Sequence, residues 1–331
     1  MSVRDVLIVG AGPSGLATAI AAKQQGLDYV IVEKGVLVDA IFNFPTHMVF
    51  FTTPELLEIG GLPLVTPYDK PTRLEALRYY RRVVDTYDLQ ISFHEEVIEI
   101  DREDDIFVVT SRDARGTTRA RQARAVVLAI GYYDHPNYLG VPGEALPHVS
   151  HYYTDAHPYY RQRVVVVGGR NSAAEASLEL FRAGAHVTLV HRGPALGDTI
   201  KYWVRPDIEN RIKEGSVTAH FNTRVREITR GSVIVEGEGG RREIAADGVF
   251  LLTGYKPDVD LMRRAGVKCD NESLTPTLDP DTFETNVPNL FIAGGAVAGR
   301  NTGSIFIENG RFHGERIVRV LSQRLAQATP T

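Results

Sequence analysis

A glycine-rich turn between a buried strand and a helix occurs twice in this chain, and it constrains the fold more than any other feature. In the first copy an apolar strand at 6–9 leads through the turn at 10–15 into a helix at 14–25, and a second strand follows at 29–33. In this context, Gly-x-Gly-x-x-Gly spacing is typical of a dinucleotide-binding site. The cofactor-binding residues predicted in this turn are Gly10, Gly12, Pro13, Ser14 and Gly15.

The same unit returns in the middle of the chain in the same register. A strand at 164–167, a turn at 168–173, a helix at 174–183 and a strand at 186–191 repeat the first copy. The residues predicted to bind a cofactor in this second turn are Gly168, Gly169, Arg170, Asn171, Ser172 and Ala173. Because the copies agree in the turn and at the distant strand end, we predict an α/β fold with two Rossmann-like, three-layer dinucleotide-binding domains.

The residues that end the second strand of each copy distinguish two ligands. Glu33 and Lys34 stand there in the first copy, and His191 and Arg192 in the second. A carboxylate accepts hydrogen bonds from a ribose diol, whereas a cationic pair accommodates a 2′-phosphate. The pattern predicts an unphosphorylated adenosine on the first site and NADPH on the second. A solvated strand end is the alternative for His191 and Arg192.

The second turn departs from the glycine pattern. Each helix N-terminus offers free N–H groups and partial positive charge to a pyrophosphate. Arg170 stands where the first copy has Gly12, so its Cβ should keep the nucleotide further from the backbone while its guanidinium is available to phosphate. We therefore expect a mobile or moderately bound NADPH, with Lys201 or Arg205 as candidates for a third positive charge.

Three further apolar strands run into glycine, at 125–131, 248–254 and 289–295. Strands that finish beneath a bound nucleotide need small residues at their carboxyl ends. Their order along the chain predicts that the second dinucleotide-binding domain is inserted into the first. The predicted division assigns 1–134 and 256–331 to the first domain and 135–255 to the second.

Composition excludes several kinds of partner. The 331 residues carry a formal net charge of −4 without a run of lysines and arginines, which argues against nucleic acid. No apolar stretch reaches the roughly 18–20 residues of a membrane span, so we expect a cytoplasmic protein without membrane contact. Cys269 is the single cysteine, which excludes an intrachain disulfide, a Cys-x-x-Cys pair and a cysteine metal cluster, and we expect no metal and an inert thiol.

Other segments resemble one family of flavoproteins. The segments are Phe44-Pro-Thr-His-Met48, Glu55-Leu-Leu-Glu-Ile-Gly60, Gly131-Tyr-Tyr133, Val141-Pro-Gly-Glu144, Ser150-His-Tyr-Tyr153, His157-Pro-Tyr-Tyr160 and Ile305-Phe-Ile-Glu-Asn-Gly310. Together with the two turns they resemble the YpdA-type bacillithiol disulfide reductases, within the thioredoxin-reductase-like flavoproteins. The resemblance covers nearly the whole chain.

The resemblance implies a homodimeric NADPH-dependent oxidoreductase that carries FAD on the first site, binds NADPH on the second and reduces oxidised bacillithiol. The residues that it adds to the FAD site are Thr46, His47, Met48, Val97, Ala129, Gly131, Gly294, Gly295, Ser304 and Ile305. It also implies that a helical run at 305–319 starts at the flavin. Gly294-Gly295 departs from the Gly-Asp of the wider superfamily, and Ser14 stands where Firmicute members carry a cysteine.

Two side chains are candidates for catalysis. Ser14 is a weak nucleophile without an activating base, so we expect it to cap the helix or to donate a hydrogen bond to the FAD pyrophosphate. His47 is a candidate proton donor to a leaving thiolate, with a packed histidine as the alternative.

Three functions stay open on the sequence. The first is an NADPH-dependent reductase of a small disulfide, working without an enzyme thiol at position 14. The second is a flavin reductase that passes electrons to a small redox protein such as ferredoxin or flavodoxin, or to a quinone. The third is a flavin redox sensor with little turnover.

Overall fold

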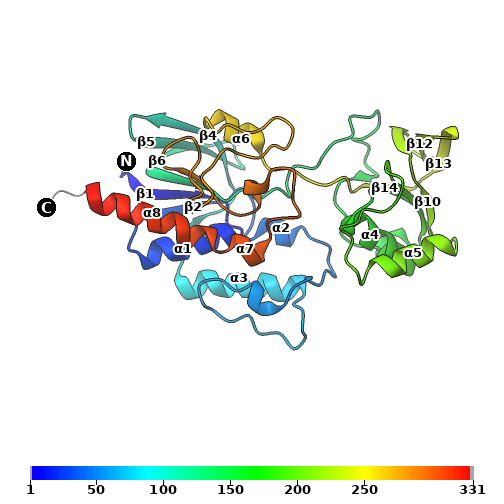
Figure 1. Cartoon of the computed structure of the whole chain (residues 1–331), viewed down its shortest axis with the longest axis horizontal. Helices are drawn as coiled ribbons and strands as arrows, with labels where there is room; N and C mark the ends of the chain where they lie inside the picture. Colours follow the sequence, from blue (N-terminus) through cyan, green and yellow to red (C-terminus); the bar gives the residue numbers. More distant parts are fainter. Residues whose placement is uncertain (1, 329–331) are drawn as a thin grey trace. The chain divides into compact units, whose positions relative to one another are not determined.

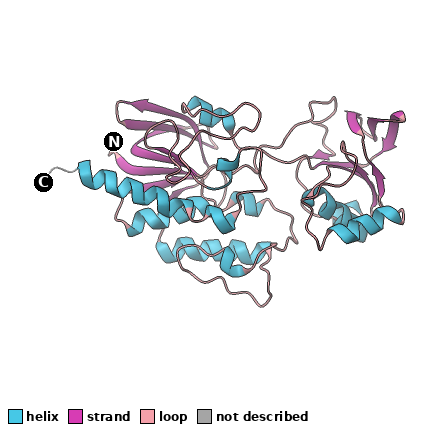
Figure 2. Ribbon diagram, viewed as in Figure 1, coloured by secondary structure: helices cyan, strands magenta, loops and turns pink. Residues whose placement is uncertain are grey.

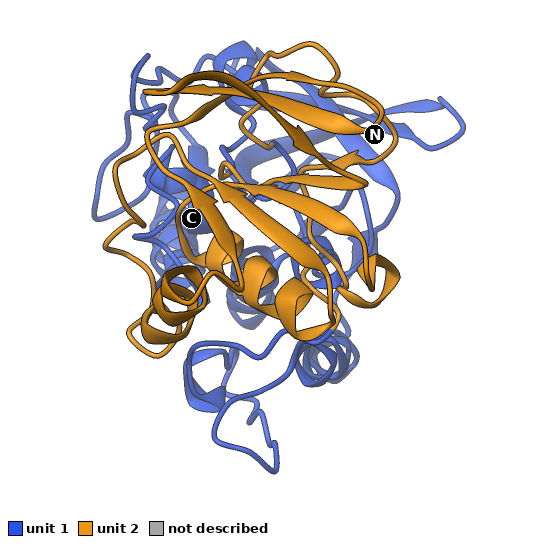
Figure 3. Ribbon diagram, turned by 90° about the vertical axis from the view of Figure 1, so that its right-hand side faces the viewer, with its two compact units in different colours: residues 1–43, 47–135, 255–331 blue, residues 44–46, 136–254 orange. Residues whose placement is uncertain are grey.

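The computed structural model describes residues 2–328, which form two compact units. Unit 2 comprises residues 44–46 and 136–254, and unit 1 comprises the rest of the described chain (Figure 3). The short segment 44–46, which the sequence-based division assigns to the first domain, groups with unit 2. One contact that holds it there is the hydrogen bond from the Thr46 N–H to the Thr154 carbonyl oxygen, 2.8 Å long.

Unit 1 is built on a seven-stranded sheet in the order β3-β2-β1-β6-β5-β4, with β15 also paired to β6. The strands are β1 Arg4–Val9, β2 Tyr29–Val32, β3 Ile91–Ser92, β4 Glu95–Glu103, β5 Ile106–Asp113, β6 Thr118–Leu128 and β15 Leu290–Ile292. β1 pairs in parallel with β2 and β6, whereas β4, β5 and β6 form an antiparallel meander. The long β6 joins the two parts, since its first half pairs with β5 and its second half with β15.

Helices cover the sheet of unit 1 (Figures 1 and 2). They are α1 Pro13–Gln24, α2 Asp39–Phe42, α3 Arg73–Tyr87, α6 Val259–Arg264, α7 Ile307–Gly310 and α8 His313–Ala328, with short 3₁₀ turns η1 Pro54–Leu56 and η3 Gly294–Ala298. α1 and α8 lie side by side, and a Cβ added to Gly314 of α8 would lie 2.6 Å from the Cα of Thr18. Only glycine allows this close approach.

The prediction of one continuous helix over 305–319 is wrong. The run contains α7 and α8, separated at Arg311 and Phe312. At the end of α7, Gly310 packs on the backbone of Gly294, and its carbonyl oxygen accepts a hydrogen bond from Ser14. Glycine is a poor helix former, and this tertiary contact takes a carbonyl group that a continuous helix would use.

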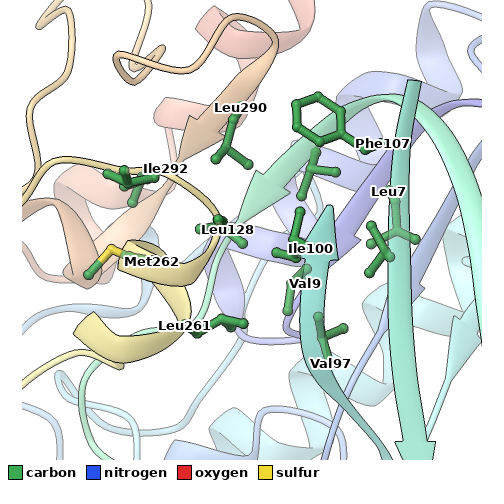
Figure 4. Packing of buried hydrophobic residues seen from close by; sticks show 14 of the residues in the cluster. Leu7, Val9, Val97, Ile100, Phe107, Leu128, Leu261, Met262, Leu290 and Ile292 are labelled. Carbon is green, nitrogen blue, oxygen red and sulfur yellow. The ribbon is translucent and has the colours of Figure 1, made fainter. Parts of the chain in front are cut away.

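One core cluster of unit 1 lies between its sheet and α6 (Figure 4). Leu7 and Val9 of β1 point into this cluster, and the alternation of side chains along a strand places Val6 and Ile8 on the opposite face. The labelled members of the cluster are Leu7, Val9, Val97, Ile100, Phe107, Leu128, Leu261, Met262, Leu290 and Ile292.

Unit 2 has three layers. Its central sheet is parallel throughout, in the order β10-β9-β8-β14-β7, and a separate antiparallel sheet has the order β11-β12-β13. The strands are β7 Val149–Ser150, β8 Arg163–Val167, β9 His186–Val190, β10 Thr218–His220, β11 Arg224–Ile228, β12 Ser232–Gly237, β13 Gly240–Ala245 and β14 Gly248–Leu251. The helices are α4 Asn171–Arg182 and α5 Arg205–Lys213, with a 3₁₀ turn η2 at His157–Tyr159.

The strand β8 shows how the layers are held. Its side chains alternate between two cores: Val164 and Val166 pack with the helices, whereas Val165 and Val167 pack with the three-stranded sheet. A strand buried on both faces is apolar along its whole length, as this one is. The predicted α/β architecture with two dinucleotide-binding-type units is therefore confirmed.

The strands that were expected to run into glycine each end three residues earlier. β6, β14 and β15 end at Leu128, Leu251 and Ile292, and irregular backbone leads to the glycines. In the described chain, no helix is both long and apolar enough to cross a lipid bilayer.

Candidate functional site

The first glycine loop joins β1 to α1, and its three glycines have different surroundings. Gly10 has a φ of +106°, and an added Cβ would lie 2.5 Å from the Ala129 carbonyl oxygen. A Cβ on Gly15 would overlap the carbonyl oxygen of Gly10. Around Gly12, by contrast, an added Cβ would meet nothing within 4 Å. Packing of the chain requires the outer two glycines, and Gly12 borders open space at a helix N-terminus, which suits the pyrophosphate of FAD.

Glu33 braces this loop from the end of β2. Its side chain is buried, and its two oxygens accept hydrogen bonds from the N–H groups of Ala11 (2.6 Å) and Gly35 (2.7 Å). The pKa of Glu33 is raised, because the effect of burial exceeds that of the two hydrogen bonds, which lower the pKa. The carboxylate keeps lone pairs for a ribose hydroxyl group. The neighbouring Lys34 pairs with Asp134 at 3.0 Å.

Ser14 does not cap α1, so the capping alternative is wrong, while the hydrogen bond to the FAD pyrophosphate stays a prediction. The N-cap is Gly12, in an extended conformation without a side-chain cap, and Pro13 occupies the first helical position. The Ser14 hydroxyl, one residue further on, donates to the carbonyl oxygen of Gly310 at 3.3 Å. A Cβ on Gly294 would lie 2.5 Å from the same hydroxyl oxygen. Ser14 thus joins α1 to η3 and α7, and its carbonyl partner is not a base that could activate it.

His313 contacts the backbone of the Gly294-Gly295 turn. The sequence did not indicate a role for this residue. Its Nδ1 accepts a hydrogen bond from the Gly294 N–H at 3.2 Å, and its ring stacks on Phe283 with 4.0 Å between centroids. Burial, and to a lesser degree the charge of Arg316, lowers the pKa of His313 to about 4. The imidazole is therefore neutral near pH 7, which its acceptor role requires.

Tyr132 explains the glycine at position 295. A Cβ on Gly295 would lie 2.6 Å from the Tyr132 ring, so the aspartate that stands here in the wider superfamily would collide with it. Ser304 and Ile305 precede α7, and the Ser304 carbonyl oxygen accepts a hydrogen bond from the Asn309 side chain at 2.9 Å. These residues end a turn, and α7 is too short to act as a strong helix dipole.

The remaining residues expected near FAD lie in different places. Val97 is buried in the core of unit 1, Ala129 supports Gly10, and Gly131 has a φ of +60° with nothing within 4 Å of an added Cβ. Thr46 belongs to unit 2, whereas His47 and Met48 belong to unit 1. His47 is exposed, and the Met48 carbonyl oxygen accepts the N–H of Arg73 at 2.9 Å.

The second glycine loop follows the backbone course of the first. The N–H of Gly168 donates to Val190 at 3.0 Å, as that of Gly10 donates to Val32 at 2.8 Å. A Cβ on Gly168, which has a φ of +156°, would lie 2.6 Å from the Leu252 carbonyl oxygen. The loop then enters α4, where Ser172 is exposed and Ala173 is buried. These contacts confirm the register in which the sequence repeats.

The strand-end residues of the second loop form a cationic group. The imidazole of His191 fills the space beside Gly169 and Gly193, where any Cβ would collide with it. Burial and the charges of Arg192 and Arg170 lower the pKa of His191. Both arginines are exposed and lack an ion-pair partner among residues 2–328. Unpaired cations around one imidazole suit a phosphate group.

A segment that we call the strap, residues 197–201, crosses the start of α4. The Gly197 N–H donates to the Gly169 carbonyl oxygen at 2.7 Å. The Asn171 amide donates to Thr199 at 3.0 Å and accepts from the Lys201 N–H at 2.9 Å. Asn171 therefore has a role in folding this segment that its place in the motif did not reveal.

The two additional cations proposed from sequence have other neighbours. Arg205 donates to the Gly197 carbonyl oxygen at 2.6 Å and to Glu209 at 2.7 Å. The charge of Lys201 acts on Glu175, whose pKa is raised to about 7, mainly by burial and then by Glu179.

Cys269 and the charged side chains offer no further redox or metal chemistry in the described residues. The thiol is half-buried, and burial raises its pKa. No group of three or more His, Cys, Asp or Glu side chains in this part of the chain could hold a metal ion.

Comparisons with known proteins agree with this geometry. The family model described as pyridine nucleotide-disulphide oxidoreductase matches residues 7–294. Bacilliredoxin reductase Bdr of Bacillus subtilis (strain 168) is 42% identical over 327 residues, which cover 98% of this chain and 99% of that protein.

Two solved structures are similar over the full length. Bacillithiol disulfide reductase Bdr (YpdA) from Bacillus cereus is 41% identical with a TM-score of 0.96, covering 98% of this chain and 100% of that one. The protein of the same description from Staphylococcus aureus is 38% identical with a TM-score of 0.92, covering 99% and 100%. The chain therefore belongs to the pyridine nucleotide-disulphide oxidoreductase family and, within it, to the bacillithiol disulfide reductase (Bdr, YpdA) family.

Proposed function

We propose that this chain is an NADPH-dependent FAD flavoprotein that reduces a bacillithiol-derived disulfide, either bacillithiol disulfide itself or a bacilliredoxin disulfide. FAD binds at the first glycine loop, and NADPH binds at the second. The observation that carries the proposal is the contrast between the loops: a buried carboxylate backs the first, whereas two arginines and a histidine stand at the second. We also propose a homodimer, which size-exclusion chromatography with light scattering tests.

The surroundings of the first loop fit FAD. The space at Gly12 admits a pyrophosphate, and Glu33 holds the loop while keeping lone pairs for the adenosine ribose. At Gly294, His313 and Ser14 fix the backbone that the family resemblance associates with the flavin. Bound FAD supplies the transfer of reducing equivalents from nicotinamide to an acceptor.

The surroundings of the second loop fit a 2′-phosphorylated nucleotide. The group formed by Arg170, His191 and Arg192 offers positive charge at the end of β9, where the adenosine ribose lies in a fold of this type. An unpaired cationic group costs stability through repulsion unless it receives an anion. NADPH carries that anion, and NADH does not.

The disulfide as substrate rests on the relatives, and its reduction here needs no enzyme thiol. Ser14 donates its hydrogen bond to a carbonyl group, and Cys269 is half-buried with a raised pKa. Neither side chain supplies the thiolate that thiol–disulfide exchange needs. With FAD bound, the flavin would supply electrons to the disulfide without an enzyme thiolate, and His47 is a candidate proton donor to the leaving thiolate.

A second candidate follows from the same lack of a thiolate. A small redox protein of the ferredoxin or flavodoxin kind, or a quinone, accepts electrons from a reduced flavin without any cysteine on the enzyme.

The test compares acceptors on one preparation. The purified protein is reduced with NADPH in the absence of oxygen, and bacillithiol disulfide, bacilliredoxin disulfide, ferredoxin, flavodoxin and a quinone are mixed with it in turn while flavin absorbance is followed. We expect rapid reoxidation by one of the two disulfides. Rapid reoxidation by the one-electron carriers alone would favour the second candidate, and slow reduction even at saturating NADPH would favour a sensor.

A further inference from the structure

The side chain of Arg170 has an unusual setting for the second position of a glycine loop. It is exposed, it has no ion-pair partner among the described residues, and its charge acts on His191 at the end of β9. A glycine at this position would let a pyrophosphate approach the backbone, whereas an arginine adds a guanidinium beside the ribose end of the site.

The strap lies directly on the stem of Arg170. A Cβ added to Gly197 would lie 3.3 Å from the Arg170 Cγ and 3.2 Å from the Gly169 carbonyl oxygen. Both distances are tighter than most real Cβ contacts, so the strap at Gly197 lies next to the aliphatic part of the Arg170 side chain. The arginine therefore has fewer ways to turn than a free surface arginine has.

Asn171 keeps the strap in this position. Its amide group makes two hydrogen bonds with backbone of the strap, at Thr199 and at Lys201, while Arg205 holds the carbonyl oxygen of Gly197. Hydrogen bonds thus hold the strap at both ends. Asn171, which holds it at Thr199 and Lys201, is the chain neighbour of Arg170.

We propose that Arg170 is a specificity-determining residue for the 2′-phosphate of an adenine nucleotide and that Asn171 is a positioning residue that acts on it through the strap. This inference rests on the proposed function, because it assumes that the second loop binds the nucleotide. It assigns Arg170 to the phosphate that distinguishes NADPH from NADH, as a second guanidinium group beside Arg192 and the imidazole of His191.

The experiment uses the flavin-loaded protein and two probes that lack nicotinamide. Isothermal titration calorimetry measures the affinity for adenosine 2′,5′-bisphosphate and for adenosine 5′-monophosphate, which differ only in the 2′-phosphate. We expect Arg170→Ala to weaken the bisphosphate about tenfold, the loss of one charged hydrogen bond, and the monophosphate less than about twofold. Arg241→Ala, an exposed arginine on β13, is the matched control and should change neither.

A double-mutant cycle tests the role of Asn171. Asn171→Ala alone should weaken the bisphosphate about threefold, and in the Arg170→Ala background it should have no further effect, because coupled residues are not additive. A merely structural Asn171 would weaken both probes and would do so in both backgrounds. The melting temperature of each variant shows that the protein is folded during the measurement.

The outcomes separate this inference from the proposed function. If the unaltered protein binds the two probes equally, NADPH is not the nucleotide of the second loop and the proposed function fails at that point. If it prefers the bisphosphate and Arg170→Ala retains the full preference, the role of Arg170 is wrong while NADPH binding stands. If the effects of the two substitutions are additive, Arg170 binds the phosphate independently of Asn171, and the positioning role of Asn171 is wrong.

Discussion

The two glycine loops of this molecule share a backbone course but differ in what holds them. Glu33, at the end of the adjacent strand, accepts hydrogen bonds from the N–H groups of Ala11 and Gly35 and so braces the first loop directly. At the matching position His191 only fills space, and the strap supports the second loop instead.

The difference follows from the charge at each strand end. A carboxylate accepts hydrogen bonds from backbone N–H groups and can brace a loop by itself, whereas guanidinium groups only donate. Arginines beside a loop rich in N–H groups therefore cannot bind the loop, and they stay available to a bound anion. A loop with that chemistry needs support from elsewhere in the chain, and the strap provides it.

The largest effect should come from glycines within the first loop. Gly12→Ala fills the open space without touching protein, so we expect a folded protein with almost no bound FAD. Gly15→Ala forces a Cβ onto the Gly10 carbonyl oxygen and should lower the free energy of unfolding by about 1–3 kcal/mol. Flavin absorbance and chemical denaturation measure the two effects.

Gly231→Ala is the control for these variants, since Gly231 also has nothing within 4 Å of an added Cβ and lies in unit 2. It should change neither flavin content nor stability. Full flavin content in Gly12→Ala would show that the open space is not the pyrophosphate site.

The next effect concerns His313, which supports Gly294. Its pKa is about 4 in the folded chain, whereas about 6.5 is usual for an unfolded one, so the unfolded state binds more protons between these values. The stabilising contribution is complete above pH 6.5 and is lost as the pH falls to 4, by about 3 kcal/mol at most. Denaturation as a function of pH measures it.

His313→Asn keeps an acceptor for the Gly294 N–H but cannot take up a proton, so it should remove most of this pH dependence. His186→Asn alters an exposed histidine of unit 2 and should leave the dependence unchanged. An unchanged slope in His313→Asn would mean that another group is responsible.

A smaller effect compares the strand ends themselves. Glu33→Gln turns an NH₂ group toward one loop N–H, and the unsatisfied buried donors should cost about 1–3 kcal/mol. His191→Gln removes no described hydrogen bond to the loop and should cost less than about 1 kcal/mol. Thermal unfolding of both variants tests this order, and a reversed order would contradict the account of how the loops are held.

The smallest effect is on nucleotide affinity. Burial, Arg192 and Arg170 lower the pKa of His191, and a bound phosphate should raise it, so nucleotide binding takes up a proton. The affinity for adenosine 2′,5′-bisphosphate should then rise a fewfold from pH 8 to pH 6.5, while that for the 5′-monophosphate changes less. His191→Gln should remove the difference, and its persistence would assign the proton to another group.

Local patterns predicted much of this molecule. The spacing of glycines predicted both units and their register. The role of Glu33, His191 and Arg192 in distinguishing the two nucleotides stays a prediction. The sequence could not show the capping at α1, because Gly12 already has the extended backbone of a cap and Pro13 takes the first helical position. Ser14 is therefore the second residue of the helix and not its cap.

The features that sequence reasoning missed depend on contacts between distant segments. His313 lies 19 residues from Gly294 along the chain, and the Ser14 hydroxyl meets a carbonyl group 296 residues away. The strap follows α4 and β9 in the chain, and it returns to contact Asn171 at the start of α4. No periodicity or motif at either partner indicates such pairs, whereas the fold brings them together.

The central claim is that this chain reduces a bacillithiol-derived disulfide without an enzyme thiol, and the Cys269→Ser protein tests it most directly. That protein is reduced with NADPH without oxygen and mixed rapidly with the disulfide that reoxidised the unaltered protein, while flavin absorbance is recorded. We predict reoxidation at the rate of the unaltered protein. A flavin that stays reduced in the Cys269→Ser protein, with the unaltered protein reoxidised, would contradict the claim.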